Sequence, residues 1–487
     1  MTETICIRNA DWVIRWNHER DRHEYLRHAD VAFTGNVIDF VGAGYDGTAD
    51  REIEGSRLMV MPGLVNIHCH PTNQPISRSV REEFANPALF MTALYDRTNF
   101  WKPDNDALYY GAVTAYGELL KSGVTTTIDF ARNAPEGWIN LMASSGLRVF
   151  ASPAFREAEW SVEHGTKLVY HWDDDRGRRQ FDQAMTFIDE AMNHRCGRLS
   201  AVVAPAQVDT CREETLLKSL AVARERGLMM QAHACQTLPE FHEMTRRTGK
   251  TPIQWMHQIG ILGPNTAIAH AIFVDEHSWT HWYTREDLDL LAETGTTVAH
   301  CPVVFSRYGH KMESFGKYVR RGINMGIGTD SAPHNMLEEM RQAIIMSRAA
   351  SGDVNDISAT DVFNAATIGG ARALQRDDIG RLCRGAKADI VLVDTGNPLM
   401  MPARDPLRNL IYTAADRAVR DVYVDGNLVV ENGQVLTLDV KTASDRLEAS
   451  QQRAELEVPN EDPEGRSGIE LSPLALPLET RGDERSP

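Results

Sequence analysis

The chain has 487 residues, a charged fraction of 24% and a net charge of -17. This negative balance excludes nucleic acid and anionic membranes as partners, because both bind basic surfaces. No apolar run approaches the roughly 20 residues of a spanning helix, and no secretory signal opens the chain, so we expect a cytoplasmic protein. The seven cysteines are scattered and odd in number, which favours reduced thiols over a disulfide framework.

The first sixty residues predict short strands, and from about residue 62 short apolar runs alternate with helical stretches. Eight parallel strands joined by crossover helices close most naturally into a barrel, so the predicted fold is an α/β (β/α)8 TIM barrel. The eight strand candidates are 64–68, 124–130, 147–155, 199–208, 228–234, 265–272, 295–302 and 323–330.

The two ends of the chain flank this barrel with further strand patterns. Residues 385–394 and 419–439 predict strands with an Asp-Gly turn, and we expect them to pair with the N-terminal strands. The predicted domains are therefore a composite β-sandwich of 1–61 and 378–440, a barrel over 62–377, and a C-terminal region over 441–487. That region predicts a polar helix over 441–456 and then a mobile tail or a strap on a partner subunit. We also expect a homodimer or larger homo-oligomer.

Histidines and an acid lie at the ends of several predicted strands. His68 and His70 are one residue apart, so strand alternation points both rings to the same side. His233, His270 and Asp330 lie at or near further strand ends, where barrels carry their active sites. Three histidines and one carboxylate fit a catalytic zinc, iron, cobalt or manganese ion with a position left for water.

Nine segments of the chain resemble, in order and spacing, the motifs of the amidohydrolase superfamily over residues 5–440. The greatest similarity is to the branch of cytosine deaminase-like and triazine hydrolase-like enzymes, which includes atrazine chlorohydrolase. The segments are MPGLVNIHCHPTN, LLKSGVTTTIDF, QAHACQ, TAIAHAIFVDE, LAETGTTVAHCP, GIGTDSAPHNMLEEMR, ATIGGARAL, GAKADIVLVD and DVYVDGNLVV.

The resemblance implies a role for each strand-end residue. His68, His70, His233 and Asp330 would hold one divalent metal, with zinc the first expectation. Asp330 would take a proton from the attacking water and return it to the leaving group, and His270 would orient that water. Residues 199–208 contain no lysine that could form a bridging carbamate, so we expect one metal rather than two.

Two departures from the family pattern bear on the substrate. Deaminases of the superfamily carry a glutamate in an H-x-x-E motif that protonates the ring nitrogen, but here the motif reads HACQ and ends in Gln236. An amide cannot supply a proton. The relatives also usually show a histidine where this chain has Ala206. Both losses favour hydrolysis of an amide-, urea- or carbamate-like C–N bond, as in the phenylurea or thiocarbamate hydrolases of this branch.

Two alternatives stay open. An aminohydrolase or dechlorinase could act on an N-heterocycle such as a triazine or pyrimidine, with Gln236 bonding the ring or with Glu240 or Glu243 replacing the missing acid. A non-catalytic scaffold is the minor alternative, since none of the four ligands is missing.

The expected substrate is a small molecule, and its contacts should come from loops around the barrel mouth. Residues 84–101 could also shape an apolar pocket through Phe90, Met91, Leu94, Tyr95 and Phe100, or could simply pack as a helix. The expected substrate contacts are Gln74, Gln236, His300, Phe305, Arg307 and Tyr308.

Overall fold

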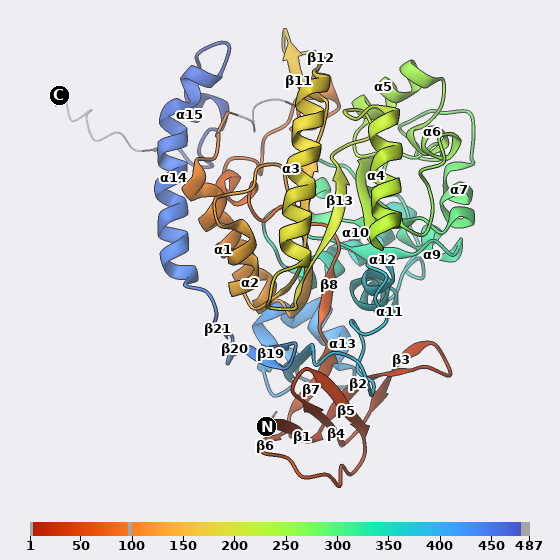
Figure 1. The fold of residues 1–487 in the computed structure, drawn as a ribbon, viewed down its shortest axis with the longest axis vertical. Coiled ribbons are helices and arrows are strands. Elements are labelled where there is room, and N and C mark those ends of the chain that lie inside the picture. The colour runs from red at the N-terminus through yellow and green to blue at the C-terminus, as the bar shows by residue number, and fades with distance from the viewer. Residues whose placement is uncertain (1–2, 96–99, 479–487) are drawn as a thin grey trace, which may run out of the picture.

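The centre of the molecule is a parallel barrel (Figure 1). The computed structural model describes residues 3–95 and 100–478. Eight strands pair in chain order, and the N–H of Ile67 donates to the carbonyl of Ile327 at 3.1 Å, which joins the first strand to the last. The predicted barrel is confirmed, and each predicted run coincides with one strand. The strands are β8 Leu64–Asn66, β9 Val124–Ala131, β10 Arg148–Phe155, β13 Leu199–Pro205, β14 Met229–Ala234, β15 Thr266–His270, β16 Thr297–His300 and β17 Met325–Ile327.

Helices surround the barrel, and capping side chains and glycines mark where several of them begin and end. The side chain of Asp104 accepts from the N–H of Ala107 at 2.8 Å and caps the first of them. Gly227 and Gly295 end two others in the left-handed conformation that glycine adopts without strain. The helices are α1 Asn105–Lys121, α2 Trp138–Ser144, α3 Asp174–Met192, α4 Glu213–Arg226, α5 Leu238–Thr248, α6 Pro252–Gln258, α7 Asp287–Thr294, α8 Pro302–Ser306, α9 Phe315–Arg320, α10 Met336–Ser351, α11 Ala359–Asn364 and α12 Gly370–Ala373.

Two further sheets lie at one end of the barrel (Figure 1). One has the order β5-β4-β1-β6, and the other has the order β21-β20-β19-β18-β7-β2-β3. The second sheet joins both ends of the chain, because β7 pairs antiparallel with β18. Ile7 and Phe33 of the first sheet share a core with Val60 and Leu392 of the second. The strands are β1 Thr4–Ala10, β2 Trp12–Asn17, β3 Arg22–Leu26, β4 Ala29–Thr34, β5 Val37–Gly42, β6 Arg51–Glu54, β7 Leu58–Pro62, β18 Ile390–Asp394, β19 Val419–Val424, β20 Asn427–Glu431 and β21 Gln434–Val435.

The C-terminal region is more ordered than its composition predicted. The helix α14 spans Val440–Glu461 and continues through Pro459, and α15 follows at Gly468–Leu471. Figure 1 shows α14 beside α1. Buried apolar side chains on one face, among them Leu447 and Val458, explain this packing. The helix predicted over 441–456 thus extends to Glu461 and a second helix follows it, while residues 479–487 lie outside the described residues and the mobile tail or strap stays a prediction. The domain boundaries themselves remain a prediction.

A hairpin that the sequence did not predict follows β10. Its strands are β11 Ala158–Glu163 and β12 Lys167–Trp172, and Figure 1 shows it at the end of the molecule opposite the two terminal sheets. The hydroxyl of Tyr170 donates to Asp209 at 2.7 Å, and the indole N–H of Trp160 donates to the same carboxylate at 3.3 Å. The hairpin is thereby attached to the loop after β13, and Trp160 reaches the barrel mouth.

A buried ion-pair cluster connects the barrel to the terminal sheets. Arg148 lies 3.3 Å from Asp389 and 3.0 Å from Asp425, and the side chains of Arg148 and Asp389 are almost fully buried. Replacing Arg148 by Met would leave a buried carboxylate without its partner. We expect Arg148→Met to lower the free energy of unfolding by about 3–5 kcal/mol, measured by chemical denaturation.

The control for this prediction is Arg22, an exposed arginine that pairs with the partly buried Glu24. Arg22→Gln should change the stability by less than about 1 kcal/mol, as is usual for surface pairs. An Arg148→Met protein as stable as the Arg22→Gln protein would contradict the prediction.

Candidate active site

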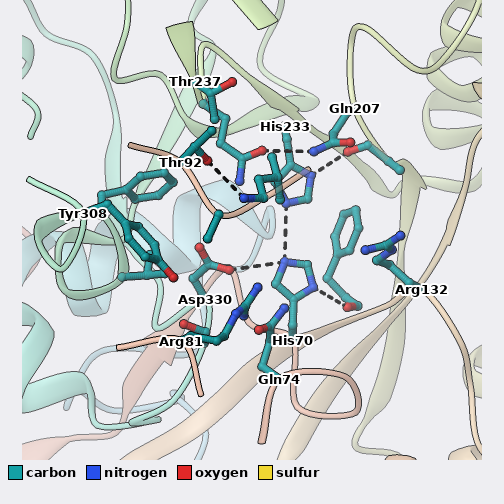
Figure 2. Close-up of a pocket in the computed structure, with 18 of the residues that line it drawn as sticks. His70, Gln74, Arg81, Thr92, Arg132, Gln207, His233, Thr237, Tyr308 and Asp330 are labelled. Carbon is teal, nitrogen blue, oxygen red and sulfur yellow. Dashed lines mark hydrogen bonds and ion pairs between the residues drawn. The ribbon is translucent and has the colours of Figure 1, made fainter. Parts of the chain in front are cut away.

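The five strand-end residues predicted from the sequence lie together at the barrel mouth. Two groups of described side chains could hold a metal ion, His68–His70–His233 and His68–His270–Asp330, and within each group the ligand atoms lie within 4.8 Å of one another. The Nε2 atom of His70 is 3.4 Å from Oδ1 of Asp330 and 3.4 Å from Nε2 of His233. Figure 2 shows these three side chains converging.

The hydrogen bonds behind the rings fix which nitrogen of each histidine carries the proton. Nδ1 of His70 contacts the carbonyl of Phe130 at 2.7 Å, and Nδ1 of His233 contacts the carbonyl of Ala206 at 2.5 Å. A carbonyl only accepts, so Nδ1 donates and the lone pair of each neutral ring is on Nε2.

The same assignment holds for His68. Its Nδ1 contacts Oε1 of Gln231 at 2.9 Å. The amide group of Gln231 donates to the carbonyl of Ile67 at 2.8 Å, so its oxygen is the acceptor toward the ring. Carbonyl and amide acceptors behind a ring are the usual support of a metal-binding histidine.

These three lone pairs point into one space and need a cation there. Nε2 of His68 is buried and has no hydrogen-bond partner among the described residues. The facing Nε2 atoms of His70 and His233 have no proton to share between them. Burial lowers the pKa of all three rings, which keeps them in the neutral form that binds a metal. The side chains present therefore fit one divalent metal ion, completed by the carboxylate of Asp330.

His270 and Asp330 are held in uncommon backbone conformations. Their φ angles are 86° and 52°, in the left-handed region, where a non-glycine residue costs about 1–3 kcal/mol. Nε2 of His270 lies 3.9 Å from Oδ2 of Asp330. Burial raises the pKa of the Asp330 carboxyl and lowers that of His270. The low pKa of His270 keeps its ring neutral beside the carboxyl group of Asp330.

A cavity that opens to the solvent lies over these groups, and its empty volume of about 790 Å³ includes the solvent at its mouth. Four of the six expected contacts line it: Gln74, Gln236, Phe305 and Tyr308. Phe305 packs its ring 4.6 Å from the ring of His270, centre to centre.

The other two expected contacts lie outside this lining. His300 is fully buried beside Phe315, with ring centres 5.5 Å apart. The guanidinium of Arg307 donates to the carbonyl of Ala332 and lies 4.0 Å from Glu82. A strand-end or loop position alone could not predict that these side chains point away from the cavity.

The two departures from the family pattern meet in space. Ala206 and Gln236 both line the cavity, and the side-chain amide of Gln207 donates to the side-chain oxygen of Gln236 at 3.0 Å. Neither glutamate considered as a replacement acid lines it. Glu240 accepts from the backbone N–H of Gln236 at 2.8 Å, and Glu243 pairs with Arg246 and Arg247.

The segment 84–101 contributes to the cavity through one of its five predicted residues. Leu94 lines the cavity together with Thr92 and Ala93. Phe90 and Met91 are 44% and 46% exposed, so they point to solvent. Tyr95 is buried and bonds Thr237 at 2.6 Å, and Phe100 packs on a separate core. Residues 96–99 of this segment lie outside the described residues.

Residues 59–429 match the amidohydrolase family. The chain belongs to this family. The predicted family membership is confirmed.

Among the residues that the structure describes, no helix is long and apolar enough to cross a membrane.

Relatives of this amidohydrolase cover nearly its whole length. A 5'-deoxyadenosine deaminase from Methanosphaera stadtmanae is 28% identical over 452 residues, 91% of this chain and 97% of the relative. The structure of atrazine chlorohydrolase from Arthrobacter aurescens TC1 with zinc is 23% identical with a TM-score of 0.78, covering 92% of this chain and 100% of that one. An adenosine deaminase from Xanthomonas campestris with bound zinc is 21% identical with a TM-score of 0.74, covering 93% and 98%.

The family and its named relatives confirm the predicted enzyme class. This amidohydrolase is a metal-dependent hydrolase that acts on carbon–nitrogen bonds of small molecules, and the scaffold alternative has no support.

Proposed function

We propose that this amidohydrolase uses one zinc ion, held by His68, His70, His233 and Asp330, to hydrolyse an acyclic amide-, urea- or carbamate-like C–N bond. One observation carries the choice of substrate class. Asp330 is the single carboxylate among the described residues that line the cavity. An acyclic substrate needs a proton mainly on the departing nitrogen, and one acid–base group can deliver it.

The side chains divide the work as follows. The bound metal would supply hydroxide at neutral pH by lowering the pKa of water. Asp330 accepts the proton released by the attacking water, holds it on its carboxylate and returns it to the departing nitrogen. His270 orients the water, and the ring of Phe305 packs against the ring of His270.

Gln236 completes the site by recognition rather than proton transfer. Its amide is held against the cavity wall by Gln207. From there it hydrogen-bonds a carbonyl or nitrogen of the substrate and supplies no proton.

A second candidate function is aminohydrolase or dechlorinase action on an N-heterocycle. The names of the relatives favour it, since a 5'-deoxyadenosine deaminase and an atrazine chlorohydrolase both match nearly the whole chain. In this case Gln236 would hydrogen-bond the ring nitrogen without protonating it.

A substrate screen separates the two functions. The zinc-loaded enzyme is incubated with phenylureas, carbamates and anilides, and in parallel with aminotriazines, chlorotriazines, cytosine, guanine and 5'-deoxyadenosine. Released amine, ammonia and chloride are measured by chromatography and mass spectrometry. We expect turnover of the acyclic compounds, and turnover confined to the rings would overturn the proposal.

The Gln236→Glu variant tests the role of the missing acid. A glutamate here still accepts the hydrogen bond from Gln207 and adds a protonatable group at the cavity wall. We expect kcat/KM on ring substrates to rise at least about tenfold, because general acid catalysis contributes roughly 10²–10⁴-fold. The matched control is Gln74→Glu, which adds an acid elsewhere in the lining. An equal gain in both variants would contradict a specific role for position 236.

Zinc as the metal, a cytoplasmic location and a homo-oligomeric state remain proposals about this enzyme. Zinc is supported by the bound zinc in two structural neighbours. Analytical ultracentrifugation of the purified chain would measure the oligomeric state, and a monomer at micromolar concentration would contradict the third proposal.

A further inference from the structure

Three arginines line one side of the cavity. Arg81 lies in the loop between β8 and α1, Arg132 directly follows β9, and Arg156 directly follows β10. These three strands are neighbours in the barrel. Figure 2 shows Arg81 and Arg132 on the two sides of His70. The guanidinium groups therefore gather in the part of the mouth next to the metal-binding residues.

These cations have almost no acceptors in the protein. Among the described residues, the side chains of Arg81 and Arg132 make no hydrogen bond or ion pair, and Nε of Arg81 is buried without a partner. Arg156 is 3.5 Å from Glu159, but that carboxylate also lies 3.7 Å from Arg176. Apart from Asp330 at the metal-binding cluster, the carboxylate nearest to these three positive charges is that of Glu159, which Arg176 shares, although the net charge of the chain is -17.

The arginines are close enough to repel one another. The charge of Arg156 is the largest cause that lowers the pKa of Arg132 to about 9; Glu159 opposes this shift and Arg81 adds a smaller contribution to it. The group stays positive at pH 7. Its side chain lines the cavity and is exposed to the solvent there. Unpaired like charges of this kind destabilise a folded protein, and a bound anion would relieve the repulsion.

We propose that the substrate carries an anionic group, a carboxylate or a phosphate, that binds Arg81, Arg132 and Arg156. The planar guanidinium presents parallel N–H donors that match the oxygens of both groups. The rest of the substrate packs on the apolar lining, where Phe130, Trp160 and Leu94 lie. The reacting C–N bond then lies over the metal centre. The position of that bond rests on the proposed function, whereas the anion site rests on the arginines alone.

A binding experiment tests the anion site without turnover. The probes are 4-ureidobenzoate, 4-ureidophenyl phosphate and the neutral match 4-ureidobenzamide, titrated calorimetrically into zinc-loaded and metal-stripped protein. The stripped protein removes direct binding of the anion to the metal. We expect at least one anionic probe to bind both forms about tenfold or more tightly than the neutral probe. The better anion identifies carboxylate or phosphate as the group recognised. Equal affinities of all three probes would overturn the proposal.

Arg132→Gln is the most informative variant, because the side chain of Arg132 makes no hydrogen bond or ion pair with the described residues that the substitution would remove. We expect the preference for the anion to fall below about twofold, and KM for an anionic substrate to rise about 30-fold with kcat little changed. The melting temperature should rise by about 2 °C, because the repulsion is removed. The control Arg22→Gln, an exposed arginine of the terminal sheets, should keep both the preference and KM. A preference that survives Arg132→Gln would contradict the role of this arginine in the anion site.

Two different results would separate a wrong anion site from a wrong substrate class. Neutral phenylureas hydrolysed as fast as 4-ureidobenzoate would leave the acyclic C–N hydrolase standing and overturn the anion site. An anion preference combined with turnover of a carboxylated aminotriazine, and none of the ureido compounds, would keep the anion site and overturn the acyclic substrate.

Discussion

Removal of the metal is expected to abolish hydrolysis, and one equivalent of zinc should restore it. Three imidazole lone pairs, on His68, His70 and His233, face one another inside a buried space. No described side chain supplies a proton between them, so the cluster has its function only around a cation. We expect the chelated enzyme to keep less than about 0.1% of the zinc-loaded kcat, because water with its ordinary pKa is a poor nucleophile at neutral pH.

Two matched histidine variants localise this effect. His233→Ala removes one lone pair, whereas His257→Ala removes an exposed ring at the end of α6. Metal content is measured by mass spectrometry after dialysis, together with kcat. We expect His233→Ala to lose stoichiometric metal and activity, and His257→Ala to keep both. Reconstitution with iron, cobalt or manganese in place of zinc then ranks the metals by restored kcat. A His233→Ala protein that retains one zinc and full activity would contradict the assignment of this ligand.

The sequence predicted the barrel and the cluster at its mouth for the same physical reason. A buried parallel strand is a short apolar run, and residues at or just beyond its C-terminal end lie at the mouth of the barrel. This local rule placed His68, His70, His233, His270 and Asp330 together without any knowledge of the loops. The left-handed backbone at His270 and Asp330 has no such signal, since histidine and aspartate adopt it only where the surrounding structure imposes it.

The cavity lining was less predictable, because it depends on how loops fold back over the strands. Arg132 and Arg156 each follow a strand directly, so the rule that selected the histidines could also have selected them. Arg81 and Trp160 lie on a loop and on an inserted hairpin, and no periodicity indicates their direction. His300 is the opposite case: it also lies at the end of a strand, but its side chain is buried and does not line the cavity.

The prediction with the next largest effect concerns Asp330, the single carboxylate of the described lining. Asp330→Asn keeps the shape of the side chain but removes the group that accepts and returns the proton. We expect kcat to fall by about 10³–10⁴-fold, at the upper end of what general acid–base catalysis contributes. The fold should persist, because the N–H of Asp330 still donates to the carbonyl of His68 at 2.9 Å.

The control for Asp330→Asn is Asp129→Asn, in which the substituted acid is equally buried but outside the cavity lining. Asp129 accepts from the hydroxyl of Tyr116 and, at 2.8 Å, from the indole N–H of Trp138. We expect Asp129→Asn to lower the stability and to keep kcat within about tenfold of the parent value, since none of these groups contacts the substrate. Bound zinc is quantified in both variants, so that loss of the metal is separated from loss of the proton acceptor.

An Asp330→Asn enzyme that holds one zinc and retains kcat within tenfold of the parent would show that another group carries the proton. Because no other carboxylate in the described lining is available for that task, such a result would direct attention to Tyr308 and His310, which also line the cavity.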